Sequence, residues 1–243
     1  CRNNISPPTA LLFVLVSFVI RPEDNRLGLG GYYKLSKYIG GDDKLYPFLN
    51  VTYNNAYLQG SEIGYNFDFG NVELTPFVKK DSTEGFEKGE LTGGNALLET
   101  RENPMLAGVK VSKKIDNLDL SLSGYRDFSS EGNNIKLKAA YTLKIFEFLY
   151  FLPSASAVYS DKNYVNYYYG MTAEESALTG GEYKDLNGSI RGEFELGAAM
   201  FFSQKAGVYF SYNVEALNGH NYNHSLIKHM ANKSFTLMGM YRF

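Results

Sequence analysis

The residues with the clearest chemical potential lie close together near the end of the chain. His220, His224 and His229 are the three histidines, and Ser225 lies among them. A serine beside a histidine is the nucleophile and base of many hydrolases, and three histidines at this spacing could also bind a metal ion. Catalysis, however, needs a constrained nucleophile and an orienting third group, and nothing marks Ser225 as lying on such a turn. We therefore expect a solvated loop, no catalytic, cofactor-binding or metal-binding residue, and a protein that is not an enzyme.

Composition excludes further classes of function. Cys1 is the only cysteine, so an intrachain disulfide and a cysteine-based metal or redox site are impossible. The 24 basic and 26 acidic residues give a formal charge of −2, which argues against nucleic acid as a partner. The chain is rich in Tyr (20), Phe (17) and Gly (24), and its 243 residues suit one large or two small soluble domains or one barrel of about ten to twelve strands. A soluble β-sandwich adhesin is a separate alternative class.

The last ten residues, 234–243, have a strongly alternating pattern. One side of an extended strand would carry apolar and aromatic residues together with one glycine: Phe235, Leu237, Gly239, Tyr241 and Phe243. A terminal aromatic residue after such a strand is similar to the C-terminal signal of bacterial outer-membrane barrels, whose rings lie in an aromatic girdle at the edge of the bilayer. The alternative is an ordinary buried last strand.

The same alternation recurs through most of the chain and predicts eleven strands, at 27–35, 45–53, 63–69, 72–78, 105–111, 118–122, 134–145, 149–159, 190–202, 208–214 and 234–243. Bacterial single-chain barrels normally have an even number of strands. A twelfth could come from residues 10–20 or from a split of 56–69, and ten would remain if one strand were false. We predict an all-β fold, a transmembrane antiparallel up-and-down β-barrel of about twelve strands.

Charged residues recur on the face that would point into this barrel, opposite the apolar face of each strand. They could line a selective pore. A narrow lumen filled by paired charges is the favoured interpretation, because the two signs nearly balance and a barrel of this size leaves little free width. The set comprises Glu62, Asp68, Glu73, Lys110, Asp119, Lys136, Lys138, Lys144, Arg191, Glu193, Glu195, Glu215 and Arg242.

Two long polar segments, 81–103 and 161–185, interrupt the barrel predicted over residues 27–243 and are expected to be loops outside the membrane. The second begins with the tyrosines at 164, 167, 168 and 169, which predict either a binding patch for sugar or protein or part of an interfacial girdle. Residues 172–178 predict a short helix with Thr172 as N-cap and Glu175 as its capping-box partner.

Residues 1–26 differ from the rest of the chain, because 10–20 is an apolar run of eleven residues interrupted only by a serine. We interpret 1–26 as an atypical or truncated export segment. A first barrel strand, a membrane-surface anchor and a lipidated Cys1 are the alternatives.

Three blocks resemble the MltA-interacting protein (MipA/OmpV) family in their order and spacing over residues 27–243. They are 27–33 (LGLGGYY) with 38–43 (YIGGDD) and 45–48 (LYPF), then 168–177 (YYGMTAEESA), and finally 224–227 (HSLI) with 241–243 (YRF). The resemblance implies a barrel in the lipid of a Gram-negative outer membrane and provides no catalytic motif. It also implies a scaffold that brings a lytic murein transglycosylase together with a penicillin-binding synthase. A small-solute pore, or a porin-like protein of adhesion or osmoadaptation, is the alternative.

Overall fold

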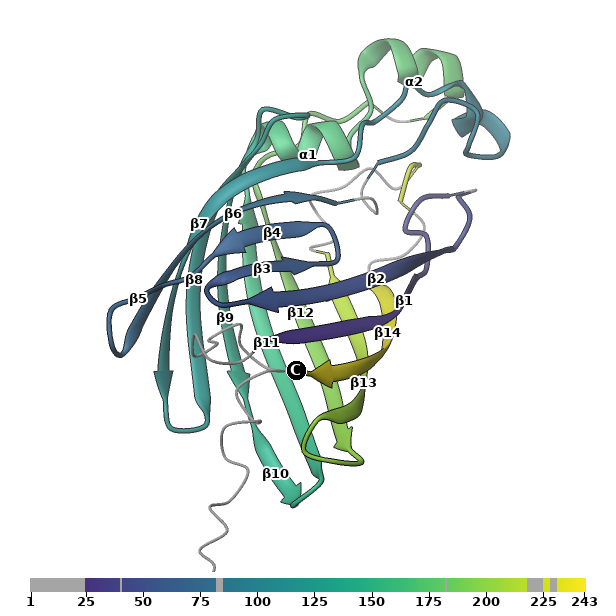
Figure 1. The fold of residues 1–243 in the computed structure, drawn as a ribbon. Coiled ribbons are helices and arrows are strands. Elements are labelled where there is room, and N and C mark those ends of the chain that lie inside the picture. The colour runs from purple at the N-terminus through teal and green to yellow at the C-terminus, as the bar shows by residue number, and fades with distance from the viewer. Residues whose placement is uncertain (1–24, 40, 82–84, 182, 218–224, 228–230) are drawn as a thin grey trace, which may run out of the picture.

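The computed structural model describes residues 25–243 apart from 40, 82–84, 182, 218–224 and 228–230, and its strands form one antiparallel sheet (Figure 1). The strands are β1 (Arg26–Lys34), β2 (Lys44–Tyr53), β3 (Ala56–Gln59), β4 (Glu62–Tyr65), β5 (Phe67–Asp68), β6 (Val72–Lys80), β7 (Met105–Ile115), β8 (Leu118–Asp127), β9 (Asn133–Tyr141), β10 (Leu143–Phe146), β11 (Leu149–Ser160), β12 (Ser189–Phe201), β13 (Ala206–Ala216) and β14 (Ala231–Arg242). The helices are η2 (Gly93–Leu97), α1 (Lys162–Tyr169) and α2 (Ala173–Thr179).

The sheet closes into a barrel. β1 pairs with both β14 and β2, and β9 pairs with both β8 and β11, so every wall strand has two neighbours. β4 with β5, and β9 with β10, are single strands interrupted only at Asn66 and Thr142. The described residues therefore form a closed barrel of twelve strands, as predicted.

The twelfth strand comes from the split of residues 56–69. β3 and β4 form a hairpin in which Ala56 pairs with Tyr65 and Gln59 pairs with Glu62. Gly60 lies at its turn with a φ of +57°, a backbone conformation that glycine adopts without steric cost. Residues 10–20, the other predicted source of a strand, lie outside the described residues.

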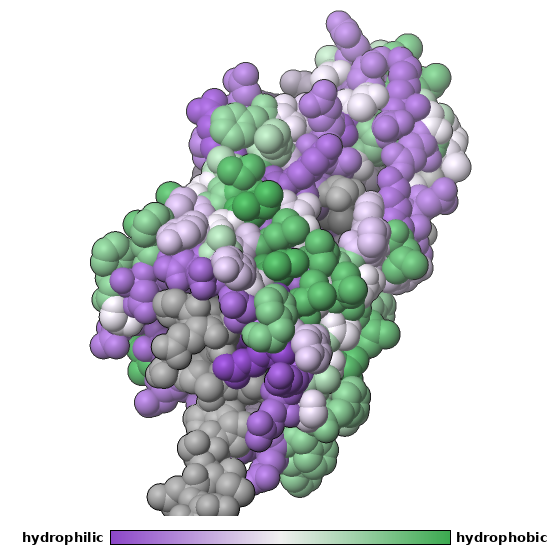
Figure 2. Space-filling view, viewed as in Figure 1, coloured by the Kyte–Doolittle hydropathy of each residue, from purple (hydrophilic) through white to green (hydrophobic). Residues whose placement is uncertain are grey.

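The outer surface of the barrel is apolar. On β14 the outward residues Leu237 and Tyr241 are 58% and 48% exposed, whereas Ser234 on the inward face is buried. Ile135 and Leu137 on β9 point outward in the same way. Figure 2 shows a patch of hydrophobic residues over the strands and mainly hydrophilic residues over the loops at the top. The alternative of a buried last strand is wrong, and the exposed apolar faces suit contact with lipid.

The inner surface is largely polar. Buried residues on it include Thr75, Asn134 and Ser160, and the Ser160 hydroxyl is hydrogen-bonded to the Asn134 side chain. A soluble sandwich would instead have an apolar interior between two sheets. A wet interior inside an apolar wall is the arrangement of a transmembrane barrel, so the sandwich alternative is also wrong.

The two ends of the barrel differ in their connections. At one end the strands are joined by short turns, as between β2 and β3, β5 and β6, or β7 and β8. The described N-terminus lies at this end too, because Phe243 N donates to Asn25 O at 3.2 Å. The opposite end carries the long connections after β1, β6, β11 and β13. Outer-membrane barrels have short periplasmic turns and long extracellular loops, so the long connections face the outside of the cell.

One glycine is needed for the closure between the first and last strands. A Cβ atom on Gly30 would lie 2.0 Å from the backbone oxygen of Leu237, which no side chain can tolerate. β1 pairs with β14 through the whole length of β1, so the close approach of the two backbones at Gly30 helps to close the barrel. Neither α1 nor α2, the two α-helices in the described chain, has the length and apolar character needed to cross a membrane.

Candidate functional site

The extracellular mouth is covered by a packed structure that we call the cap. It is a cluster of buried apolar side chains from the four long connections: Tyr38, Phe86, Leu91, Leu98, Tyr164, Val165, Tyr168, Tyr169, Met171, Leu186, Leu226 and Ile227. Helix α1 supplies four of these side chains. Helix α2 follows Met171 in the chain and is counted with the cap, and both helices lie above the strands in Figure 1. Residues that are far apart in the sequence thus build a small core of their own at this end of the barrel.

Helix α1 supplies the centre of the cap. Asp161 is its N-cap and accepts a hydrogen bond from Tyr164 N at 3.1 Å. Tyr164, Val165 and Tyr168 then fall on one face and are buried. The Tyr168 hydroxyl donates to Asp127 Oδ2 at 2.9 Å, which attaches the helix to the end of β8.

The predicted role of the tyrosine-rich segment was wrong for three of its four members. Tyr164, Tyr168 and Tyr169 are at most 2% exposed, so they form neither a binding patch nor a girdle at the lipid surface. Tyr167 is partly buried and packs against the same cluster. Burial in the cap explains the four tyrosines, because each supplies a large apolar ring and a hydroxyl that can be satisfied at the edge of the core.

A buried ion pair joins two loops within the cap. Arg101 Nη2 donates to both carboxylate oxygens of Glu175, at 2.8 and 2.6 Å, and Arg101 Nε donates to Tyr167 O at 2.7 Å. The two side chains are only 8% and 4% exposed. Glu175 also closes the capping box with Thr172, as predicted for this helix. Arg101 therefore fixes the position of α2 over the loop between β6 and β7.

The Glu175 carboxyl is ionised in this setting. Burial raises its pKa, but hydrogen bonds from Arg101 and from the backbone N–H groups of Thr172 and Glu99 outweigh burial, and the pKa is lowered below its usual value. The charge of Arg101 and the fixed N–H groups stabilise the carboxylate rather than the neutral acid. Protonation of Glu175 would consequently weaken the cap.

Below the cap, the predicted inward charges pair between strands of one wall, either neighbours or strands separated by one other strand. Lys136 on β9 binds Glu193 on β12, and Lys138 lies 3.6 Å from Glu195. Arg191 Nε lies 3.2 Å from Glu215 on β13. Pairing rather than an open charged channel is therefore observed along this wall, and the prediction of mutually paired charges is confirmed there.

Other members of the predicted inward set contact the cap or the opposite wall of the lumen. The Arg191 guanidinium lies 5.6 Å from the centre of the Tyr164 ring, so α1 rests directly above it. On the opposite wall Glu62 accepts a hydrogen bond from the Tyr57 hydroxyl at 2.7 Å. Two other members of the predicted inward set, Asp68 and Lys144, are exposed near the short turns rather than enclosed in the lumen.

The periplasmic end carries a projecting hairpin, formed by β10 and the start of β11. β10 pairs with β11 and with no other described strand, and all four of its residues are exposed. Phe146 and Phe148 at the tip are 57% and 51% exposed, and their rings stack with centres 5.8 Å apart. In Figure 1 this hairpin extends away from the cap at the lower end of the barrel. It presents both an open strand edge and an aromatic surface.

The loop that first suggested chemistry is only partly described. His220, His224 and His229 lie outside the described residues, so their geometry relative to Ser225 is not tested. Ser225 itself belongs to the cap region, where its backbone oxygen accepts a hydrogen bond from Asn95 Nδ2 at 3.1 Å. This contact ties the last long loop to the loop after β6.

Comparisons with solved structures find a porin and an outer-membrane protein, both at low sequence identity. A NanC porin structure aligns with a TM-score of 0.49 and 12% identity over 90% of this chain and all (100%) of that one. OmpT, an outer-membrane protein of Vibrio cholerae, aligns with a TM-score of 0.42 and 11% identity over 90% and 97% of the two chains. A search of curated protein sequences gives no match.

The family comparison covers nearly the whole barrel. The model of the family described as MltA-interacting protein MipA matches residues 27–243. This range runs from the second residue of β1 to the end of the chain, and so includes the cap, the lumen and the periplasmic hairpin. The apolar outer wall, the polar lumen and this match lead to one conclusion: the chain belongs to the MltA-interacting protein MipA family and is a barrel of the Gram-negative outer membrane.

Proposed function

We propose that this barrel is a non-enzymatic scaffold whose periplasmic end binds a lytic murein transglycosylase of the MltA kind. The observation that carries the proposal is the core that the four long connections pack at the extracellular mouth, in a member of a family described as MltA-interacting. A barrel whose outer end is covered by a packed core and whose charges are paired is better suited to binding than to free diffusion. A penicillin-binding synthase is the second partner that we propose, so that the scaffold would join murein hydrolysis to murein synthesis.

The periplasmic hairpin is the surface that we propose for the transglycosylase. Its exposed aromatic tip, Phe146 and Phe148, can pack against an apolar surface, since aromatic residues are enriched at the centres of protein interfaces. The free edge of β10 can accept an extended segment of the partner by backbone hydrogen bonding. Both features lie at the periplasmic end of the barrel, which faces the murein layer.

Equilibrium binding between the purified barrel in lipid nanodiscs and the purified transglycosylase tests the proposal. We expect saturable binding that falls at least tenfold in the double variant Phe146→Ser/Phe148→Ser, because loss of two interface aromatics typically costs more than 1.4 kcal/mol. The matched control is Phe128→Ser, which removes a ring that is 59% exposed at the extracellular end. A heat-dependent shift in electrophoretic mobility checks that each variant still forms a barrel. Absence of binding by the unaltered barrel would contradict the proposal.

A small-solute pore is the second candidate, favoured by the polar and charged inner surface. In that case the cap would have to open. Conductance of the purified barrel in a planar bilayer separates the two candidates. The scaffold proposal predicts no steady conductance, whereas steady single-channel currents from the unaltered protein would favour the pore.

A further inference from the structure

Charged side chains on the outer wall of the barrel are few and all of one sign. Alternation along the described strands places four of them on the outward face, all basic and none acidic: Lys80 on β6, Lys113 on β7, Arg126 on β8 and Lys233 on β14. A charge on a lipid-facing wall is unfavourable at the centre of the bilayer and is tolerated near its surfaces. All but Lys113 lie at the extracellular ends of their strands, at the level of the outer leaflet.

Lys80 and Arg126 belong to one continuous surface over β6, β7 and β8, which lie side by side (Figure 1). Lys80 is directly opposite Met105, and Phe128 N donates to Met105 O at 2.9 Å, so these three residues form the uppermost row. Arg126 is opposite Ala107 in the row below. From the spacing of strands and the rise per residue, the Cα atoms of Lys80 and Arg126 are about 12 Å apart. Neither cation forms an ion pair with another described residue.

The acidic residues that border this surface are engaged elsewhere or lie beyond the strand ends. Three carboxylates have partners of their own: those of Asp81, Asp127 and Asp161. Glu102 and Glu131 are exposed on the connections next to β7 and β8, farther from the membrane than either cation. Glu84 lies outside the described residues. The part of the wall that meets lipid therefore keeps its positive charge.

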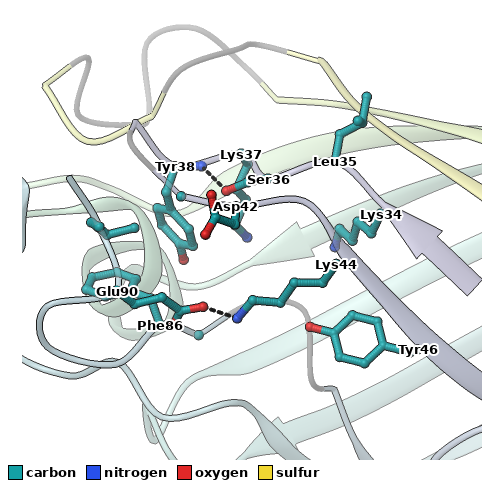
Figure 3. Close-up of a pocket in the computed structure, with 13 residues that line it drawn as sticks. Lys34, Leu35, Ser36, Lys37, Tyr38, Asp42, Lys44, Tyr46, Phe86 and Glu90 are labelled. Atoms are coloured by element: carbon teal, nitrogen blue, oxygen red, sulfur yellow. Dashed lines mark hydrogen bonds and ion pairs between the residues drawn. The ribbon is translucent and has the colours of Figure 1, made fainter.

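The lysines at the extracellular ends of β1 and β2 do not belong to this surface. Lys34 and Lys44 are on the inward face, and Figure 3 shows both side chains among those that line the pocket between the loops after β1 and β6. There Lys44 forms an ion pair with Glu90. The charge of the surface over β6, β7 and β8 is thus separate from that pocket.

Directly beneath Arg126 the outer wall is apolar and hollowed. Gly124 is the next outward residue of β8, and it is flanked in register by Val109 on β7 and Ile135 on β9, both exposed. A Cβ atom added on Gly124 would meet no other atom within 4 Å. The two branched side chains therefore border a shallow apolar groove, which is shaped to take an extended hydrocarbon chain below a charged headgroup.

We infer that this surface binds lipid A, the phosphorylated glycolipid of the outer leaflet, with its two phosphates on Lys80 and Arg126 and an acyl chain in the groove at Gly124. Ammonium and guanidinium groups form charge-assisted hydrogen bonds to phosphate, and long basic side chains on a lipid-facing wall extend toward the headgroups. Two cations this far apart suit the phosphates at the two ends of a disaccharide better than the single phosphate of a phospholipid. The surface is remote from the periplasmic hairpin, so its ligand does not depend on the scaffold proposal.

Native mass spectrometry of the purified full chain in detergent tests the inference, with diphosphorylated lipid A, monophosphorylated lipid A and phosphatidylglycerol as probes. We expect saturable binding of diphosphorylated lipid A, at least tenfold tighter than that of phosphatidylglycerol, with the monophosphorylated form between the two. Arg126→Met is expected to weaken lipid A binding about tenfold, because a hydrogen bond between charged groups is lost. The matched control Lys113→Met, which removes one outward charge near the periplasmic end of β7, should leave the affinity unchanged.

A second variant separates loss of binding from loss of folding. Met105 is exposed on the outward face beside Lys80, so Met105→Lys adds a third cation to the surface and is expected to strengthen lipid A binding, a gain that misfolding cannot produce. A heat-dependent shift in electrophoretic mobility checks that Arg126→Met still forms a barrel. Equal affinity for lipid A and phosphatidylglycerol, lipid A affinity that is the same in Arg126→Met and in the unaltered protein, or an equal loss in Lys113→Met would overturn the inference.

Discussion

The ion pair between Arg101 and Glu175 is expected to determine how firmly the cap is closed. In Glu175→Gln the Arg101 guanidinium would stay buried without a counter-charge. Removal of one partner from a buried pair costs about 3–5 kcal/mol. We expect Glu175→Gln to reduce the stability of the closed cap by an amount at the lower end of this range, about 3 kcal/mol. The reason is that the amide oxygen of glutamine can still accept one hydrogen bond from Arg101. The backbone N–H groups of Thr172 and Glu99, which now donate to the carboxylate, would also bind a weaker acceptor.

Hydrogen exchange measured by mass spectrometry is the suitable assay, because it reports local opening separately from unfolding of the barrel. A loss of about 3 kcal/mol corresponds to exchange that is faster by roughly a hundredfold in peptides covering α1 and α2. Peptides from the barrel strands serve as the internal reference and should exchange at unchanged rates.

A double variant supplies the control for this prediction. Arg101→Leu/Glu175→Leu leaves no buried charge, so it should disturb the cap less than Glu175→Gln does. Unchanged exchange in Glu175→Gln, or equal acceleration in the strands, would refute the view that this pair holds the cap over the mouth.

Three further predictions concern the pH dependence of Glu175, the N-cap residue of helix α1 and the closure of the barrel. Because the folded pKa of Glu175 is lowered, its contribution is present above the ordinary carboxyl pKa of about 4.3 and is lost as pH falls through the folded value. The protection of α2, taken as its exchange rate relative to that of an unfolded peptide at the same pH, should fall only in that acidic range, and protection that stays constant with pH would contradict this. Asp161→Ala removes the N-cap of α1 and should cost about 1 kcal/mol or more, seen as faster exchange in α1 than in α2. Gly30→Val should prevent the close approach of β1 to β14 and abolish the heat-dependent mobility shift, whereas Gly124→Ala, whose added Cβ meets nothing within 4 Å, should retain it.

The barrel wall could be predicted from the sequence because its signal is local. A strand with one face in lipid and one in a wet lumen alternates residue by residue, as Ile135 and Leu137 do against Lys136 and Lys138. The strand predicted at 63–69 corresponds to β4 and β5, whereas β3 was harder to find. It has only four residues, too few for alternation to identify it, and the even strand number was the indication that one strand was missing.

The cap was not predicted, because it is held by contacts between loops that are distant in sequence. Arg101 and Glu175 are separated by 74 residues, and nothing local indicates that they meet. Helix α1 did have a local signal that was missed: Asp161 as an N-cap, followed by Tyr164, Val165 and Tyr168 at helical spacing. The tyrosines suggested a surface role because the surrounding segment is polar, whereas four loops together make a core large enough to bury them.

Site-specific photo-crosslinking in intact outer membranes tests most directly whether the barrel acts by binding at its periplasmic end. A photoreactive residue would replace Phe148 in the hairpin tip or, as the matched position, Phe128 at the extracellular end, in cells that also make a tagged lytic transglycosylase of the MltA kind. The scaffold account predicts a crosslinked product of barrel and transglycosylase from position 148 and none from position 128. Crosslinking from position 128 alone, or from neither position in membranes that contain both folded proteins, would contradict it.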